Sequence, residues 1–379
     1  MDRKMTSFVF GRMMRLQDFD WALPNDFLSF SHYKRVIDSL DWTSSPGTPY
    51  NQRYSNNGQM FGVRDGIPSV SIVEEIWQHI QYRLHHRTCD PIYLFVKPEP
   101  LPERKQGRPR LISSVSVIDQ IIDHMLFDAF NQRIIDQASM SPIKVGWTPM
   151  LGGWKTIPRK GISIDKSSWD WTMAHWIFDA ILKFKASNCT SSGEAFIQWR
   201  DLAAWRYRCL FNNPEFCLPN GFIFRQKNLG VMKSGSVVTI TDNSLAQLII
   251  HFRTYFELGW VEEVPEYIWV CGDDTRQSRP KHLRMYLEYL SGFCKVKDWT
   301  ERCEFVGCRF LQDGRVEPLY KGKHAFTILH ADPAVETDLA YSYSLLYHKS
   351  IDRDNVRNML LTYGPPMTLD FADEIWNGE

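Results

Sequence analysis

Apolar side chains recur at two spacings along the chain, and each spacing predicts a different kind of element. A repeat of three to four residues is typical of amphipathic helices, whereas short apolar or alternating runs are typical of strands. The helical repeat is found in segments 71–84, 118–129, 176–184, 195–210, 239–256 and 281–293. Strands are expected in segments 91–100, 161–165, 222–226 and 266–275, and a hairpin in 303–320.

The order of these elements is strand and helix, helix and strand, hairpin, and then a terminal part that is mainly helical. This order predicts an α+β fold with a central antiparallel sheet. With 379 residues, the chain is too long for one simple core. Its hydrophobic content of 44% and charged content of 23% fit a folded protein rather than a disordered one.

Composition excludes little beyond this. The 44 basic and 44 acidic side chains cancel, but a local basic groove for nucleic acid could be offset by acids elsewhere. The eight cysteines contain no C-x-x-C pair, so no structural zinc site is expected and reduced thiols are the simpler interpretation. No apolar run approaches the roughly 18 residues of a membrane-spanning helix.

Two neighbouring acids stand at the tip of an apolar strand, in "IWVCGDDTRQ". Gly272, Asp273 and Asp274 could form a plain solvated turn, since Gly and Asp are common turn residues. Adjacent carboxylates repel each other, however, and are expected to have a cation beside them. A second acid, Asp165, ends the strand "GISID", and Asp170 follows five residues later. Asp165 could instead cap the helix that follows.

One hypothesis explains both strand ends. A pair of Mg²⁺ ions about 4 Å apart, held by carboxylates, can clamp the attacking and leaving oxygens of a phosphoryl transfer. We therefore predict that Asp165 and Asp273 bind the metal ions, with Asp274 assisting.

A small-residue loop leads into a helix in "KSGSVVTITDNSLAQ". Thr239 and Asn243 are four residues apart and share one helix face. If that face looks towards Asp170, Asn243 and Asp170 could hydrogen-bond a ribose hydroxyl, the group that distinguishes RNA from DNA. A plain loop with a helix cap is the alternative.

A basic stretch, "VKPEPLPERKQGRPRL", runs from Lys97 to Arg110. It holds five cationic side chains against two acids, Glu99 and Glu103. It could be a solvated charged loop, or it could line a channel for triphosphate and template.

Taken in order, these segments resemble the RNA-dependent RNA polymerases of positive-strand RNA viruses. The resemblance is carried by D-x4-D at 165–170, S-G-x3-T-x3-N at 234–243 and G-D-D at 272–274. Upstream, "KPE…RPRLISSVSVIDQ" resembles the basic fingertip motif of that family, and "SSPGTP" resembles its template-guiding motif. The sequences "RLISSVSVIDQ" and "DWT" are most similar to those of the sobemovirus and polerovirus group.

The resemblance implies a right-hand fold of fingers, palm and thumb, with an antiparallel palm sheet flanked by helices. It implies these regions: 1–160, N-terminal extension and fingers; 161–187, palm; 188–225, fingers insertion; 226–320, palm; 321–379, a small thumb. It also implies two Mg²⁺ ions, for which Mn²⁺ could substitute. Template RNA, nascent RNA, NTPs, a viral protein primer and other replication proteins are the implied partners. The implied location is the host cytoplasm, at membrane-associated replication complexes.

Site roles follow from the resemblance in the same way. Metal binding falls to Asp165, Asp273 and Asp274, and proton donation to pyrophosphate falls to Lys297, with Lys295 as the alternative. Nucleotide binding falls to Asp170, Ser234, Gly235, Thr239, Asn243, Lys97, Arg108 and Arg110. Template and primer contacts fall to Ser45, Gly47, Cys308 and Phe310.

Two other functions remain open at this point. A reverse transcriptase uses related acids but blocks the 2′-hydroxyl with an aromatic gate, whereas Asp170 and Asn243 would accept it. A non-catalytic RNA-binding replication subunit would be expected to have lost the acids that are intact here.

Overall fold

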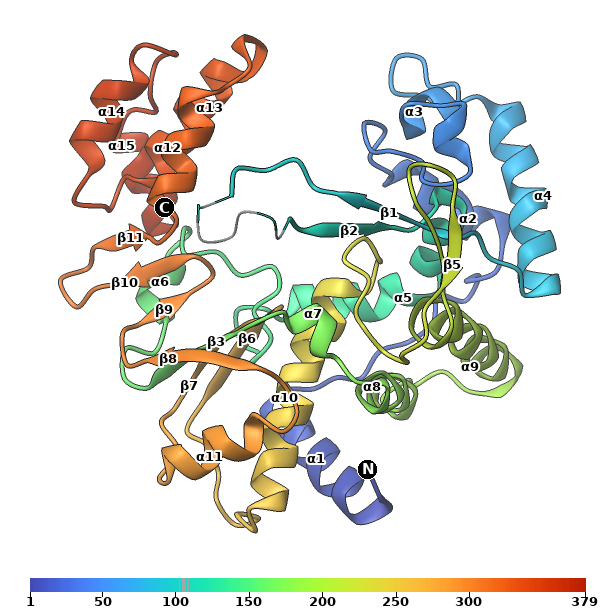
Figure 1. Ribbon diagram of the computed structural model, residues 1–379, viewed down its shortest axis with the longest axis horizontal. Helices are drawn as coiled ribbons and strands as arrows, with labels where there is room; N and C mark the ends of the chain where they lie inside the picture. The colour runs from blue at the N-terminus through green and yellow to red at the C-terminus, as the bar shows by residue number, and fades with distance from the viewer. Residues whose placement is uncertain (102, 104–106, 108) are drawn as a thin grey trace.

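The computed structural model describes residues 1–101, 103, 107 and 109–379 (Figure 1). Its helices are α1 (Arg3–Leu16), α2 (Phe30–Asp38), α3 (Asn57–Met60), α4 (Val70–His86), α5 (Val117–Asp136), α6 (Gly153–Thr156), α7 (Trp169–Thr172), α8 (His175–Ser187), α9 (Gly193–Tyr207), α10 (Thr239–Glu257), α11 (Leu283–Leu290), α12 (Lys321–Leu329), α13 (Glu336–Leu346), α14 (Arg353–Leu360) and α15 (Leu369–Asn377). Its strands are β1 (Ile92–Val96), β2 (Leu111–Ser114), β3 (Ile162–Lys166), β4 (Glu215–Cys217), β5 (Ile223–Arg225), β6 (Ile268–Cys271), β7 (Asp274–Gln277), β8 (Val296–Thr300), β9 (Glu304–Phe305), β10 (Cys308–Phe310) and β11 (Val316–Pro318).

A four-stranded sheet in the order β6-β7-β3-β8 lies at the base of the molecule in Figure 1. Every pair in it is antiparallel, which confirms the predicted central sheet. Helix α10 packs against β6 and against α1, α8 and α11. Its residues 241–252 are all buried, as expected for a helix that is apolar or internally bonded on every side.

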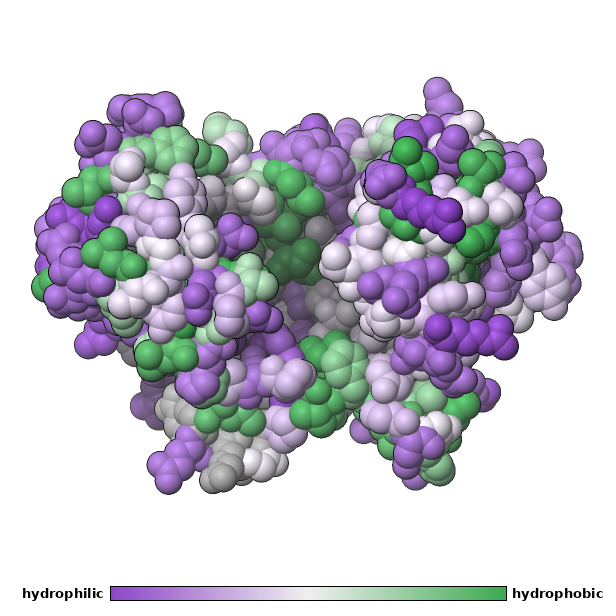
Figure 2. Space-filling model, turned by 90° about the horizontal axis from the view of Figure 1, so that it is seen from above, coloured by the Kyte–Doolittle hydropathy of each residue, from purple (hydrophilic) through white to green (hydrophobic). Residues whose placement is uncertain are grey.

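A second sheet, in the order β2-β1-β4-β5, belongs to the lobe at the upper right of Figure 1. Its β1–β4 pair is parallel. The residues that directly follow β1 extend towards the helical lobe at the upper left, where α12 to α15 lie. There Lys323 of α12 binds Glu99 at 3.2 Å. Seen from above, the two lobes flank a deep hollow (Figure 2).

A three-stranded sheet, β11-β10-β9, joins the base to the helical lobe. The predicted turn at Asp313 and Gly314 connects β10 to β11, and Leu311 N donates to Arg315 O at 2.9 Å across it. A further turn, at Val306 and Gly307, connects β9 to β10. Both its residues have positive φ, 43° and 75°, as tight hairpins require.

The C-terminal helix α15 is bound to α6. Trp376 is fully buried, and its carbonyl accepts a hydrogen bond from the Trp154 indole at 3.1 Å. Among the described residues, no helix is both long and apolar enough to span a bilayer.

Candidate active site

Gly272 and Asp273 form the two-residue turn between β6 and β7, where Cys271 pairs with Asp274. Gly272 has φ +61°, and a Cβ there would come within 3.0 Å of Ile240 Cδ1. The positive φ of the turn therefore favours glycine, and an added Cβ would also press on the end of the Ile240 side chain of α10. The turn exposes Asp273 at its tip and places Asp274 at the start of β7.

The antiparallel register brings Asp165 to this turn. Ser163 pairs with Arg276 and Ile164 with Thr275, so the next position on β3 faces Asp274. Burial and the Asp273 carboxylate raise the pKa of Asp274 to about 6, and Asp165 adds to this rise. The three predicted acids are thus close enough to repel one another.

Two lysines lie among these acids. Lys297, on β8, forms an ion pair with Asp165, so the structure brings the predicted proton donor to the acidic cluster. Lys166 is buried, and its ammonium donates to the Thr275 hydroxyl at 2.8 Å. Burial lowers the pKa of Lys166 to about 8. Lys166 was not predicted as a site residue, although its place next to Asp165 on a strand puts it on the opposite, buried face.

The acids offer the hard oxygen donors that Mg²⁺ prefers. Within the described part of the chain, no three His, Cys, Asp or Glu side chains already converge as a preformed metal site. The donor chemistry nevertheless fits a divalent cation, because Asp274 sits beside two further carboxylates whose repulsion a cation would relieve.

Two side chains of α10 hold the turn in place. Ser244 Oγ accepts a hydrogen bond from Gly272 N at 2.9 Å. The amide of Gln247 donates to the carbonyls of Gly272 at 3.3 Å and Asp273 at 3.1 Å. Ser244 and Gln247 are three residues apart on one helix face, next to Asn243, and this spacing was the available signal for their role.

Asp170 and Asn243 do meet, as the shared helix face suggested. The Asn243 amide donates to Asp170 Oδ1 at 3.0 Å, and the buried Asn243 amide oxygen has no hydrogen-bond partner among the described residues. Burial raises the pKa of the Asp170 carboxyl, while the bond from Asn243 opposes that rise. Thr239 is turned back into its own loop, since its hydroxyl donates to the carbonyls of Lys233 and Ser236, both at 2.7 Å.

The loop before α10 is fixed to β2. Ser234 Oγ accepts from Ser113 N at 3.1 Å, and Gly235 N donates to Ser113 O at 3.1 Å. A Cβ on Gly235 would lie only 2.5 Å from that carbonyl oxygen. Gly235 therefore permits a close backbone contact between β2 and the loop before α10.

Among the basic residues, Lys97 and Arg110 flank Glu99, at 3.9 Å and 3.7 Å. Arg110 is largely exposed and close enough to Asp170 to oppose the rise in the pKa of that carboxyl. Arg108 lies outside the described residues.

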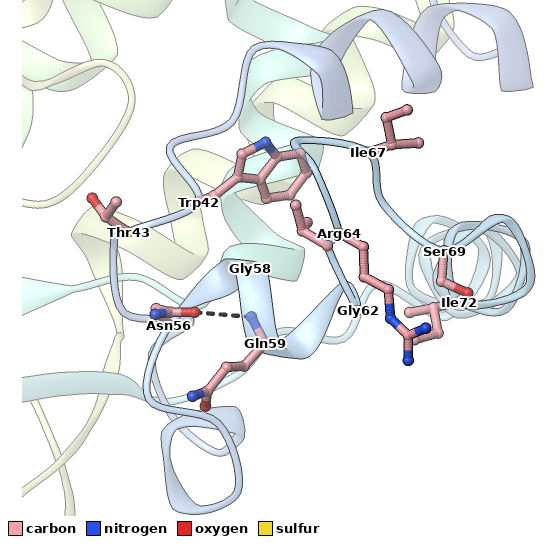
Figure 3. Close-up of a pocket in the computed structure, with 11 residues that line it drawn as sticks. Trp42, Thr43, Asn56, Gly58, Gln59, Gly62, Arg64, Ile67, Ser69 and Ile72 are labelled. Carbon is pink, nitrogen blue, oxygen red and sulfur yellow. Dashed lines mark hydrogen bonds between the residues drawn. The ribbon is translucent and has the colours of Figure 1, made fainter.

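The loop that holds Ser45 and Gly47 contacts the start of α5. Val117 N donates to Pro46 O at 2.8 Å, and a Cβ on Gly47 would lie 2.9 Å from Ser116 Cα. Beside this loop an open groove of about 800 Å³ runs past Trp42 and Arg64 (Figure 3). None of the predicted site residues lines it.

Cys308 and Phe310, assigned to primer contact, are buried on β10, at 5% and 3% exposure. Both side chains therefore pack in the apolar cluster of the hairpin rather than on its surface. Tyr320, which follows β11, is 60% exposed, and its ring lies beside Gly307.

Comparison with known proteins agrees with this geometry. The family described as viral RNA-dependent RNA polymerase matches residues 13–275, more than half of the chain. The chain therefore belongs to the viral RNA-dependent RNA polymerase family. It is similar to a solved structure, the Sicinivirus 3Dpol RNA-dependent RNA polymerase, with a TM-score of 0.72 and 16% identity over 98% of this chain and 84% of that one. The α+β architecture is accordingly the predicted right-hand polymerase fold.

The relatives include sobemovirus and polerovirus replicases, which confirms the predicted resemblance. The chain is 31% identical to replicase polyprotein P2AB of Cocksfoot mottle virus, over 60% of this chain and 27% of that protein. It is 30% identical to protein P1-P2 of Turnip yellows virus, over 58% and 22%. It is 25% identical to the RNA-directed RNA polymerase of Mushroom bacilliform virus, over 78% and 71%. The chain thus spans about a quarter of the polyproteins that it matches.

Proposed function

We propose that this chain is a template-directed RNA polymerase that replicates a viral genome. The 3′-hydroxyl of the growing RNA attacks the α-phosphate of an NTP, and pyrophosphate leaves. The observation that carries the proposal is the β3–β7 register, which brings Asp165 to the turn that holds Asp273 and Asp274.

These three acids would hold two Mg²⁺ ions, or Mn²⁺ in their place. When bound, the ions supply charge neutralisation at the phosphates and a more acidic attacking hydroxyl. Lys297 would protonate the departing pyrophosphate once it is released from its ion pair with Asp165, and its contact with the acidic cluster supports this role.

The remaining residues bind and orient the nucleotide and the RNA. Asp170 and Asn243 would recognise the ribose, and the cations of Lys97 and Arg110 would attract the triphosphate. Ser234, Gly235 and Thr239 shape the loop on which that recognition depends. The loop with Ser45 and Gly47 would guide the template, and the β9–β10–β11 hairpin would support the primer end.

The division into fingers, palm and thumb is proposed with the boundaries predicted from sequence. One observation bears on residues 1–160: α1 packs on α10, so this helix lies with the proposed palm. A viral replicase is expected to act in the cytoplasm of its host. We propose a viral protein primer and other replication proteins as its partners. We also propose that it acts at membrane-associated replication complexes.

The test is primer extension with purified protein, an RNA template, NTPs and Mg²⁺. Complementary RNA is expected, and Asp273→Ala should abolish its synthesis while leaving the melting temperature near that of the parent. Asp370→Ala, an exposed acid in the first turn of α15, is the matched control and should retain activity. Unchanged synthesis by Asp273→Ala would refute the proposal.

A further inference from the structure

A fully buried lysine stands directly before the Ser234–Gly235 loop. Lys233 has 0% exposure, and its ammonium donates to the carbonyls of Val231 at 2.6 Å and Gly230 at 3.4 Å. Among the residues that the structure describes, it forms no ion pair. Burial lowers the pKa of Lys233 to about 7. A buried cation without a carboxylate partner is unfavourable for folding, so its retention calls for an explanation.

The backbone around Lys233 is hydrogen-bonded to the two segments that carry Asp170 and Asn243. Met232 N donates to Asp170 O at 2.8 Å, on the segment that follows β3. The carbonyl of Lys233 accepts the Thr239 hydroxyl at 2.7 Å, in the first turn of the helix that carries Asn243. Lys233 therefore lies where these two segments meet.

The charge of Lys233 also acts on Asp170. Burial raises the pKa of the Asp170 carboxyl, and the nearby Asp273 carboxylate adds to this rise. The bond from Asn243 and the positive charges of Arg110 and Lys233 oppose it. Of these two cations, Arg110 is mostly exposed and Lys233 is fixed in the interior.

The hydrogen bonds of Asp170 and Asn243 leave one buried polar atom available to a ligand. Asn243 uses one amide N–H on Asp170, and its buried amide oxygen accepts from no donor in the part of the chain that the structure describes. A ribose 2′-hydroxyl could donate to that oxygen or to the ionised Asp170 carboxylate, and it could accept from the second N–H of the Asn243 amide.

We propose that Lys233 is a positioning residue for sugar recognition, which holds the 230–239 loop against Asp170 and contributes positive charge beside that carboxylate. The proposal rests on the proposed polymerase function, since it concerns the ribose of the incoming nucleotide. It goes beyond that function because it assigns NTP-over-dNTP selectivity to a residue that does not touch the nucleotide.

The chain offers a matched control in Lys144. This lysine is 2% exposed, and its ammonium also donates to two carbonyls, Ala138 O at 2.9 Å and Ser139 O at 3.1 Å. Burial lowers its pKa to about 8. Lys144→Met thus removes the same kind of buried, carbonyl-bound cation without touching the contacts of Asp170.

The experiment compares kcat/KM for ATP and 2′-dATP in the parent protein, Lys233→Met, Lys233→Gln and Lys144→Met, with melting temperatures for each. Both methionine variants should change the melting temperature in the same direction and to a similar extent, because each replaces a buried, carbonyl-bound ammonium with an apolar side chain. The ATP preference should fall about tenfold in Lys233→Met, the loss of one hydrogen bond to a charged group, and should stay at the parent value in Lys144→Met. Lys233→Gln can still donate to the carbonyls but has no charge, so it should show the same loss if the charge is what matters.

Each outcome decides the question. A folded Lys233→Met or Lys233→Gln with the parent ATP preference would overturn the proposal. Failure of both Lys233 variants to fold, with Lys144→Met folded, would also overturn it, because Lys233 would then serve the fold as a whole. Absence of RNA synthesis by the parent protein would instead count against the polymerase function itself.

Discussion

The amide of Asn243 lies 3.0 Å from the carboxylate of Asp170, although 73 residues separate them in the chain. One residue belongs to the first turns of α10 and the other to the short helix after β3. Their contact forms a polar pair beside the acidic cluster, and no donor from residues 1–101, 103, 107 or 109–379 reaches the Asn243 oxygen.

This pair leads to a prediction about sugar selection. Asn243→Ala should reduce the preference for NTPs over dNTPs by roughly 10- to 100-fold, because a hydrogen bond to a charged group contributes about 1.5–3 kcal/mol. Kinetics with ATP and 2′-dATP measure the ratio. Asn188→Ala, which removes a buried asparagine outside the site, should keep the parent ratio. An unaltered ratio in Asn243→Ala would exclude the pair from ribose recognition.

Local patterns predicted much of this site. The apolar stripe of α10 and the strand of Asp165 are strong periodic signals, and they placed the D-x4-D, S-G-x3-T-x3-N and G-D-D segments on the correct elements. The pattern failed for β7, whose Thr275, Arg276 and Gln277 are polar and buried. Arg276 is accommodated because its guanidinium donates to the carbonyls of Pro158, Arg159 and Arg302.

The other features that the sequence did not predict also depend on tertiary contacts. The role of Lys166 depends on the face of β3 that it occupies, and that of Lys233 on carbonyls that the folded loop directs towards it. Helix α1 was not predicted because its apolar residues are interrupted by charged ones, yet it buries Val9, Arg12 and Met13. Spacing along the sequence carries no information about such contacts.

The raised pKa of Asp274 predicts a pH-dependent stability. Below about pH 4 both the folded and unfolded states hold the proton, so the group has no effect. Between pH 4 and 6 the unfolded state has lost the proton and the folded state retains it, so the free energy of unfolding falls as pH rises. Above pH 6 the penalty is constant, up to about 3 kcal/mol for a rise from 3.8 to about 6.

Asp274→Asn should therefore melt at a higher temperature than the parent at pH 7.5 without divalent metal, and the difference should disappear near pH 4. Thermal melts across this range, with the chelator EDTA present, measure it. Equal melting temperatures at both pH values would show that Asp274 is not destabilised by its neighbours.

The close contact of Gly235 with β2 predicts a cost for any side chain there. Gly235→Ala should reduce the free energy of unfolding by about 1–3 kcal/mol, since its Cβ would lie 2.5 Å from the Ser113 carbonyl oxygen. Urea denaturation provides the measurement. Gly322→Ala is the control: it lies in α12 with open space around it and should be neutral or slightly stabilising. A neutral Gly235→Ala would mean that the loop is not fixed to β2.

The central claim is that Asp165 and the Asp273–Asp274 turn share bound divalent cations. Fe²⁺ in place of Mg²⁺, with ascorbate and peroxide, generates hydroxyl radicals that cut the chain beside the metal. The account predicts cuts both near residue 165 and near residues 273–274, and Asp165→Asn should weaken both sets together. Cuts at only one of the two segments, or a set near 273–274 that Asp165→Asn leaves unchanged, would contradict it.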